Sequence, residues 1–146
     1  MNINETLKHY FGYDSLRPGQ QELIEGILQR KDVLGIMPTG AGKSLCYQVP
    51  ALMLDGITIV VSPLISLMTD QVKALNQAGV HAAYINSSLT ENQIRTALFY
   101  AAQGRYKIIY VAPERLNTMR FLEFACQVDI SMVTVDEAHC ISQWGQ

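Results

Sequence analysis

A glycine-rich segment at residues 37–44 has the residue types that bind phosphate groups, and it reads MPTGAGKS. Glycine has no Cβ, so consecutive backbone N–H groups can converge on phosphate oxygens. Apolar residues on both sides predict a strand before the segment and a helix after it, and a helix N-terminus attracts anions. We expect Lys43 to reach the β and γ phosphates of a nucleoside triphosphate and the Ser44 hydroxyl to ligate Mg²⁺. The residues expected to contact the nucleotide here are Thr39, Gly40, Ala41, Gly42, Lys43 and Ser44.

Two adjacent carboxylates, Asp136 and Glu137, directly follow the apolar residues 133–135. Neighbouring carboxylates at a strand end repel each other, and a bound cation relieves that repulsion. We expect Asp136 to hold Mg²⁺, and Glu137 to position and deprotonate an attacking water. The alternative for the acidic pair is a solvated acidic turn. The alternative for residues 37–44 is an ordinary glycine-rich turn, because Met37 replaces the first glycine of the general phosphate-loop pattern. Together the two segments predict a nucleoside triphosphatase.

Short apolar runs alternate with helical patterns along the chain. The predicted strands cover residues 32–37, 57–61, 82–85, 107–111 and 132–135. The predicted helices cover residues 20–28, 43–54, 91–102 and 117–126, with a further helical stripe from 64 to 75 that Gly79 ends. The strands are nearly continuous in apolar residues, as expected for strands covered on both faces. This order predicts an α/β fold with a parallel sheet and right-handed crossovers, in which ligands bind at the carboxyl ends of the strands.

The composition is that of a soluble globular protein of one domain. The 146 residues are 49% hydrophobic and 16% charged, and the formal net charge is −2. An acidic chain of this kind gives no general electrostatic support for nucleic-acid binding, so any such role must rest on local sites. Three cysteines without a CxxC pair predict neither a zinc site nor a disulfide framework, and the apolar runs are shorter than the roughly 20 residues that cross a bilayer. We therefore expect a cytoplasmic protein with no membrane partner.

Five segments resemble the motifs of superfamily 2 helicases, and in particular of RecQ-type DNA helicases. Residues 37–44 are similar to motif I, which in this superfamily lacks the first glycine, and residues 136–145 are similar to motif II running into an aromatic-rich loop. Residues 11–20 resemble the adenine-recognising motif 0, residues 61–72 motif Ia, and residues 111–116 the DNA-contacting motif that follows. The resemblance implies a RecA-like P-loop fold, with ATP and Mg²⁺ as cofactors and single-stranded or partial-duplex DNA as the partner. It also implies 3′–5′ translocation on single-stranded DNA and unwinding of duplexes in repair and recombination.

The resemblance also assigns an adenine site to the N-terminal region. Gln20 would pair its side-chain amide with the edge of adenine, because glutamine offers both a donor and an acceptor. Tyr13 would stack on the base, and Arg17 would assist beside it. The alternative for Tyr13 and Arg17 is a surface cluster that caps a helix.

The same resemblance implies DNA contacts after two strands. Backbone N–H groups at Ser62 and Pro63 would hold a DNA phosphate, and Pro113 occupies the equivalent place after a later strand. Arg115 is either a phosphate contact or a surface ion pair, and its neighbour Glu114 favours the ion pair.

The segment after the acidic pair is implied to couple DNA binding to hydrolysis. Trp144, with Gln143 beside it, would stack on single-stranded DNA, although a lone tryptophan can instead anchor a core. His139 would take part in catalysis by responding to the nucleotide or to a partner lobe.

Complete helicases of this type have two RecA-like lobes, and the second supplies an arginine finger. We expect residues 1–146 to form the N-terminal part of the first lobe, truncated after motif II. The second lobe and the zinc-binding and winged-helix regions would be missing. Such a fragment is expected to bind ATP–Mg²⁺ weakly and to be nearly inactive alone. The alternatives are an RNA helicase of the same superfamily, or a non-catalytic remnant that binds nucleotide or DNA. Association with a bacterial nucleoid is a further expectation.

Overall fold

The computed structural model describes residues 2–17, 19–29 and 44–135. The chain divides into two compact units, residues 1–55 and residues 56–146. Among the described residues, no helix has both the length and the apolar character needed to cross a membrane. The predicted strand at 32–37 lies outside these residues.

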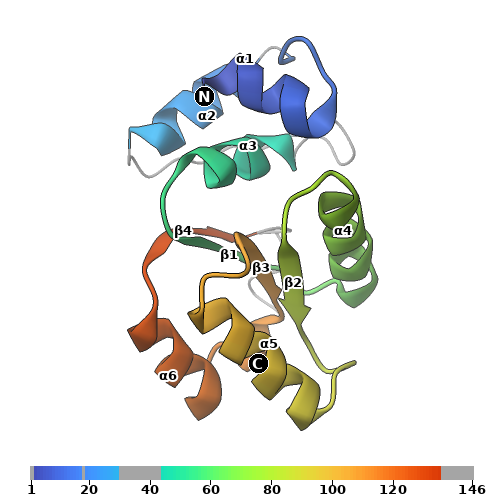
Figure 1. Cartoon of the computed structure of the whole chain (residues 1–146), viewed down its shortest axis with the longest axis vertical. Coiled ribbons are helices and arrows are strands. Elements are labelled where there is room, and N and C mark those ends of the chain that lie inside the picture. The colour runs from blue at the N-terminus through green and yellow to red at the C-terminus, as the bar shows by residue number, and fades with distance from the viewer. Residues whose placement is uncertain (1, 18, 30–43, 136–146) are drawn as a thin grey trace. The chain divides into compact units, whose positions relative to one another are not determined.

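The first unit is helical (Figure 1). It contains α1 (Ile3–Thr6), a π-helical turn (Leu7–Phe11), α2 (Gln20–Leu28) and α3 (Leu45–Met53). Leu7, Ile24 and Val49 are fully buried and form its core, with one residue from each of three helical segments. The helix predicted at 20–28 is confirmed, and the one predicted at 43–54 is found with its ends at Leu45 and Met53.

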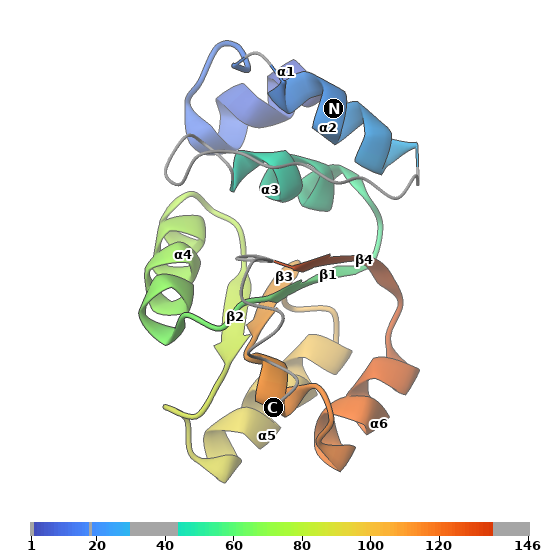
Figure 2. The ribbon, with the colours of Figure 1, turned by 180° about the vertical axis from the view of Figure 1, so that it is seen from behind.

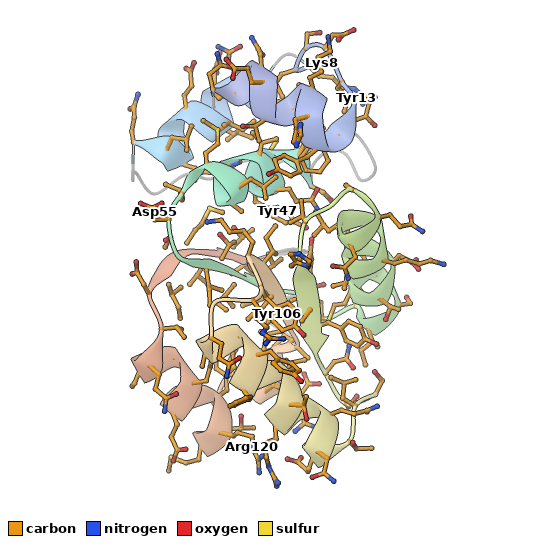
Figure 3. The ribbon with its side chains drawn as sticks, viewed as in Figure 1. Lys8, Tyr13, Tyr47, Asp55, Tyr106 and Arg120 are labelled. Carbon is orange, nitrogen blue, oxygen red and sulfur yellow. The ribbon has the colours of Figure 1, made fainter. Side chains whose placement is uncertain are left out.

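Local contacts explain the ends of the first helical segments. The Asn2 side chain caps α1, since its Oδ1 accepts the Glu5 N–H at 2.8 Å. The π-helical turn ends at Gly12, which has a φ of 77° in the left-handed region where glycine is favoured. Tyr13 follows and is exposed (Figure 3). The sequence patterns did not predict these two segments.

The second unit is a parallel α/β sheet. Its strands are β1 (Ile57–Val61), β2 (Ala82–Ile85), β3 (Ile108–Val111) and β4 (Ile130–Val135), in the spatial order β2-β3-β1-β4. Its helices are α4 (Ile65–Gln77), α5 (Glu91–Ala102), a 3₁₀ turn (Pro113–Arg115) and α6 (Met119–Gln127). All described pairings are parallel, as predicted. The strands predicted at 57–61 and 82–85 match in extent, β3 begins one residue later than predicted, and β4 begins two residues earlier.

Helices cover both faces of this sheet (Figures 1 and 2). On one face, Ile59 of β1 and Ile109 of β3 pack with Leu98 of α5 and Phe121 of α6. On the other face, the Tyr110 hydroxyl donates to Gln71 Oε1 of α4 at 3.4 Å. One helix on one side and two on the other are what right-handed crossovers require for this strand order.

The end of α4 confirms the predicted stop. Gly79 has a φ of 91°. The Val80 N–H donates to the Leu75 carbonyl at 2.9 Å, and the Gly79 N–H donates to the Asn76 carbonyl at 3.2 Å. This pair of bonds is a Schellman motif, in which glycine supplies the left-handed residue that ends a helix.

The prediction that every strand is covered on both faces is wrong for β4. Val133 is 61% exposed and Val135 is 41% exposed, whereas all five residues of β1 are buried. Within the described sheet, β4 is the outermost strand and pairs with β1 on one side. An apolar run therefore indicated a strand here but did not indicate its depth in the sheet.

Candidate functional site

The carboxyl ends of the parallel strands meet at one edge of the sheet. The register pairs Val61 of β1 with both Val111 of β3 and Val135 of β4. Just beyond the strands, the Ser62 N–H donates to the Val111 carbonyl at 3.1 Å. Asp136 follows Val135 directly in sequence. Residues that the sequence assigned to magnesium and to DNA are thus attached to neighbouring strands at the same edge.

Ser62 holds the turn between β1 and α4 together. Its side chain is buried, and its Oγ accepts the Leu64 N–H at 3.3 Å. Its own N–H is bonded to β3, and Pro63 has no N–H, so neither residue offers the backbone donor that we expected for a DNA phosphate. The amides of Ile65 and Ser66 open α4 and have no acceptor within the helix. The expected phosphate contact, if made by backbone, therefore belongs to the first turn of α4.

Arg115 forms the ion pair that the sequence favoured, but its partner is different. Its Nη1 lies 3.4 Å from Oε1 of Glu91, the first residue of α5, rather than pairing with its neighbour Glu114. The Nη2 of Arg120, in the first turn of α6, lies 3.9 Å from Oε2 of the same carboxylate. One glutamate thus faces two arginines that come from a different part of the chain. Pro113 is half-buried and is the first residue of the 3₁₀ turn that ends at Arg115.

These three charged residues line a pocket of about 250 Å³ at the carboxyl end of β2. Its other lining residues are Ile85, Ile94, Leu98, Thr118 and Phe121. Two guanidinium groups and one carboxylate give the lining a net charge of +1, although the whole chain carries −2. The pocket is therefore a local positive site in an acidic protein, with an apolar floor.

Helix caps position the pocket's charges. Thr90 forms a capping box with Gln93, which fixes the start of α5 at Glu91. The Thr118 hydroxyl donates to the Arg115 carbonyl at 2.8 Å and caps α6, so it joins the turn that carries Arg115 to the helix that carries Arg120. The sequence pattern could have located the cap at Thr90, but it carried no signal that linked Glu91 to arginines 24 and 29 residues later.

Two residues of the predicted adenine motif, Arg17 and Gln20, are in contact. The Arg17 N–H donates to Gln20 Oε1 at 2.6 Å, and Gln20, which is 1% exposed, begins α2. This bond ties the segment before α2 to its first residue, and among the described residues no side chain caps the helix at Gly19. Tyr13, the residue expected to stack on the base, is 55% exposed.

The described end of the phosphate segment is Ser44. It is half-buried, and its carbonyl accepts the Gln48 N–H at 2.9 Å, so α3 begins directly after the lysine and serine of the motif. Two residues later, burial raises the pKa of the Cys46 thiol. The remaining predicted site residues lie outside the described residues: Thr39, Gly40, Ala41, Gly42, Lys43, Asp136, Glu137, His139, Gln143 and Trp144.

Solved structures share this fold. A crystal structure of the DUF1998 helicase MrfA bound to DNA and AMPPNP superposes with a TM-score of 0.71 at 18% identity, over 94% of this chain and 20% of that one. The RNA helicase Prp28 from Chaetomium thermophilum bound to ADP gives a TM-score of 0.66 at 23% identity, over 97% and 37%. These likenesses establish the fold, and they confirm the predicted α/β architecture of a helicase RecA-like domain.

Sequence relatives are much closer. The chain is 53% identical over 140 residues to the ATP-dependent DNA helicase RecQ of Bacillus subtilis, covering 95% of this chain and 24% of the relative. It is 48% identical to RecQ of Haemophilus influenzae over 96% and 23%, and 41% identical to helicase Q1 of Rattus norvegicus over 98% and 24%. The chain spans about a quarter of the length of these relatives. The predicted resemblance to RecQ-type helicases is confirmed.

The sequence pattern of the DEAD/DEAH box helicases matches residues 17–146, which is nearly the whole chain. It includes both the phosphate segment at 37–44 and the acidic pair at 136–137. This chain belongs to the DEAD/DEAH box helicase family.

Proposed function

We propose that this chain is the ATP-binding part of a RecQ-type helicase that couples ATP hydrolysis to 3′–5′ movement on DNA. The observation that carries the proposal is the shared sheet edge, where β1, β3 and β4 end side by side. In sequence, the expected magnesium ligand Asp136 follows β4, and the segments expected to contact DNA follow β1 and β3. Relatives named as ATP-dependent DNA helicases at 41–53% identity support the same activity.

The nucleotide would be held by the residues around α3. Lys43 and Ser44 would bind the phosphates and Mg²⁺, and the start of α3 immediately after them supplies helix N-terminal amides for an anion. Hydroxyl and carboxylate oxygens, from Ser44 and Asp136, are the ligand types that Mg²⁺ prefers. Hydrolysis of the bound ATP would supply the free energy for movement, and Glu137 would orient the attacking water and accept its proton.

Adenine selectivity would come from motif 0. Because Gln20 Oε1 accepts the Arg17 N–H, the carbonyl end of the side chain has a fixed direction. A fixed amide presents its NH₂ group at a defined position, which favours recognition of one base edge over others. We therefore expect ATP to bind in preference to GTP.

DNA would lie along the carboxyl edge of the sheet. The first-turn amides of α4 and the arginines at the pocket are the phosphate contacts that the geometry offers, and His139, Gln143 and Trp144 would link them to the nucleotide. This function places the protein in the cytoplasm beside DNA. An RNA helicase of the same superfamily remains the second candidate, because the fold is shared with an RNA helicase.

A binding comparison separates the two candidates. Fluorescence anisotropy with labelled oligo(dT) and oligo(U) of equal length, each in the presence of ATP analogue and Mg²⁺, measures the two affinities directly. The proposal predicts tighter binding of DNA. Equal or tighter binding of RNA would contradict it.

A further inference from the structure

The pocket between the first turns of α5 and α6 holds two arginines that are not among the residues expected to contact the nucleotide. The Arg115 side chain is 23% exposed and that of Arg120 is 39% exposed, so both are partly accessible to solvent. Figure 3 shows Arg120 at the end of α6 that lies near α5. Guanidinium groups on an apolar floor are suited to bind the oxygens of a phosphate group.

The carboxylate that faces these arginines is held loosely. The distances of 3.4 Å and 3.9 Å exceed the 2.7–2.9 Å that is typical of strong charge-assisted hydrogen bonds. Glu91 is also 65% exposed, so it stays largely hydrated in the pair and loses little when the pair opens. A phosphate group could therefore displace it from both arginines.

We propose that Glu91 is a built-in competitor for a nucleic-acid phosphate, occupying Arg115 and Arg120 until a phosphate of the bound strand replaces its carboxylate. The proposal rests on the DNA-binding function proposed above and adds to it a residue that limits affinity. Occupation by Glu91 shields the two positive charges from anions bound weakly in solution. A strand that is also held elsewhere along the sheet edge would deliver its phosphate at high effective concentration and open the pair.

The consequence is that Glu91 lowers affinity and reduces the number of phosphates neutralised. Removing its charge while keeping its shape should free both arginines. We expect Glu91→Gln to tighten oligo(dT) binding about three- to tenfold at low salt. The slope of log affinity against log salt concentration should steepen by about 0.7 for each additional phosphate that the freed arginines neutralise.

The matched control is Glu114→Gln. It removes the same charge from a glutamate adjacent to Arg115 that is exposed and has no ion pair to any residue that the structure describes. General electrostatic repulsion of DNA would change in the same way in both variants. A difference in DNA affinity between the two variants therefore reports specific competition by the Glu91 carboxylate.

The experiment is anisotropy of labelled oligo(dT) with the 146-residue chain, at several salt concentrations, for wild type and both variants. Circular dichroism checks that each variant is folded. The expected result is an increase in affinity and slope for E91Q, little change for E114Q, and loss of the increase when E91Q is combined with R115Q. An increase for E114Q equal to that for E91Q, or weaker binding by E91Q, would overturn the proposal.

Two further arms identify the ligand. Millimolar inorganic phosphate at constant ionic strength should weaken oligo(dT) binding more in E91Q than in wild type, because Glu91 no longer shields the arginines; equal competition in both would overturn the proposal. Absence of oligonucleotide binding by both wild type and E91Q would overturn it too. ATP titration of the same samples reports separately on the proposed function, since the described residues that line this pocket lie between Ile85 and Phe121, whereas the expected nucleotide residues of the phosphate segment are 39–44.

Discussion

Gly56 controls how β1 starts beside β4, and replacing it with alanine should weaken the second unit. Its φ is +88°, and an added Cβ would lie 2.6 Å from the Asp129 carbonyl oxygen and against the Ser131 hydroxyl. The hydroxyl can rotate away, but the carbonyl cannot, because it accepts the Ile57 N–H at 2.9 Å. Relief would require β1 and β4 to separate where they begin to pair.

The size of the effect follows from two contributions. A left-handed conformation costs a non-glycine residue about 1–2 kcal/mol. Overpacking against fixed atoms typically adds about 1–3 kcal/mol. We therefore expect Gly56→Ala to lower the free energy of unfolding by about 2–5 kcal/mol, whereas Gly79→Ala, with a φ of +91° and nothing within 4 Å, should show only the first contribution.

Urea unfolding followed by circular dichroism measures both variants against the wild type. The comparison isolates the close approach of β4, since the two glycines have nearly the same φ. Equal destabilisation by the two substitutions would refute the reasoning. It would mean that the start of β4 can move away from residue 56 at little cost in free energy, and that the contact of Gly56 with Asp129 does not set the strand register.

Three other substitutions and modifications test local features. Thr58 is 1% exposed and its hydroxyl has no hydrogen-bond partner within the described ranges, so Thr58→Val should raise the free energy of unfolding by about 1 kcal/mol; a lower urea midpoint would contradict this. Gln20→Glu keeps an acceptor for the Arg17 N–H but loses the amide donor, so it should reduce the preference for ATP over GTP, with circular dichroism to check folding; an unchanged nucleotide preference would be inconsistent with the adenine role. Gln20→Ala also loses the hydrogen bond to Arg17, which should cost about 1 kcal/mol of stability. Burial raises the pKa of the Cys46 thiol and so lowers its thiolate fraction. Iodoacetamide at about pH 8 should therefore modify the exposed Cys126 before Cys46, and Cys46 should become reactive only as the pH rises. Peptide mass spectrometry measures this order, and earlier modification of Cys46 would contradict it.

Much of the sheet could be predicted because its elements carry local signals. Residues 57–61 and 82–85 are short apolar runs next to turn residues, and β1 and β2 have the predicted bounds. The stop at Gly79 depended on one backbone conformation that glycine supplies. Such features are encoded within a few residues, so a periodic pattern is sufficient to locate them.

Features that depend on tertiary packing could not be predicted in the same way. The π-helical turn at Leu7–Phe11 is stabilised by Leu7 in a core shared with Ile24 and Val49, which no local pattern specifies. Glu91 meets Arg115 only because the strand order brings the starts of α5 and α6 together.

The candidate site shows the same division. The sequence motifs identified Ser62 and Arg115 as residues at the sheet edge, and both lie there. Which backbone N–H groups are already bonded, and which carboxylate pairs with an arginine, depended on the strand register and on the helix starts. The contact partners of a motif residue are therefore a property of the fold, even where the motif itself is clear.

The most direct test of the central claim is a titration of the chain with ATP and Mg²⁺ by calorimetry, compared with Lys43→Ala and with the matched surface control Lys73→Ala. The proposed role of Lys43 predicts that wild type and Lys73→Ala bind ATP with similar affinity and that Lys43→Ala loses detectable binding. Unchanged affinity in Lys43→Ala would contradict the assignment of residues 37–44 as the phosphate site.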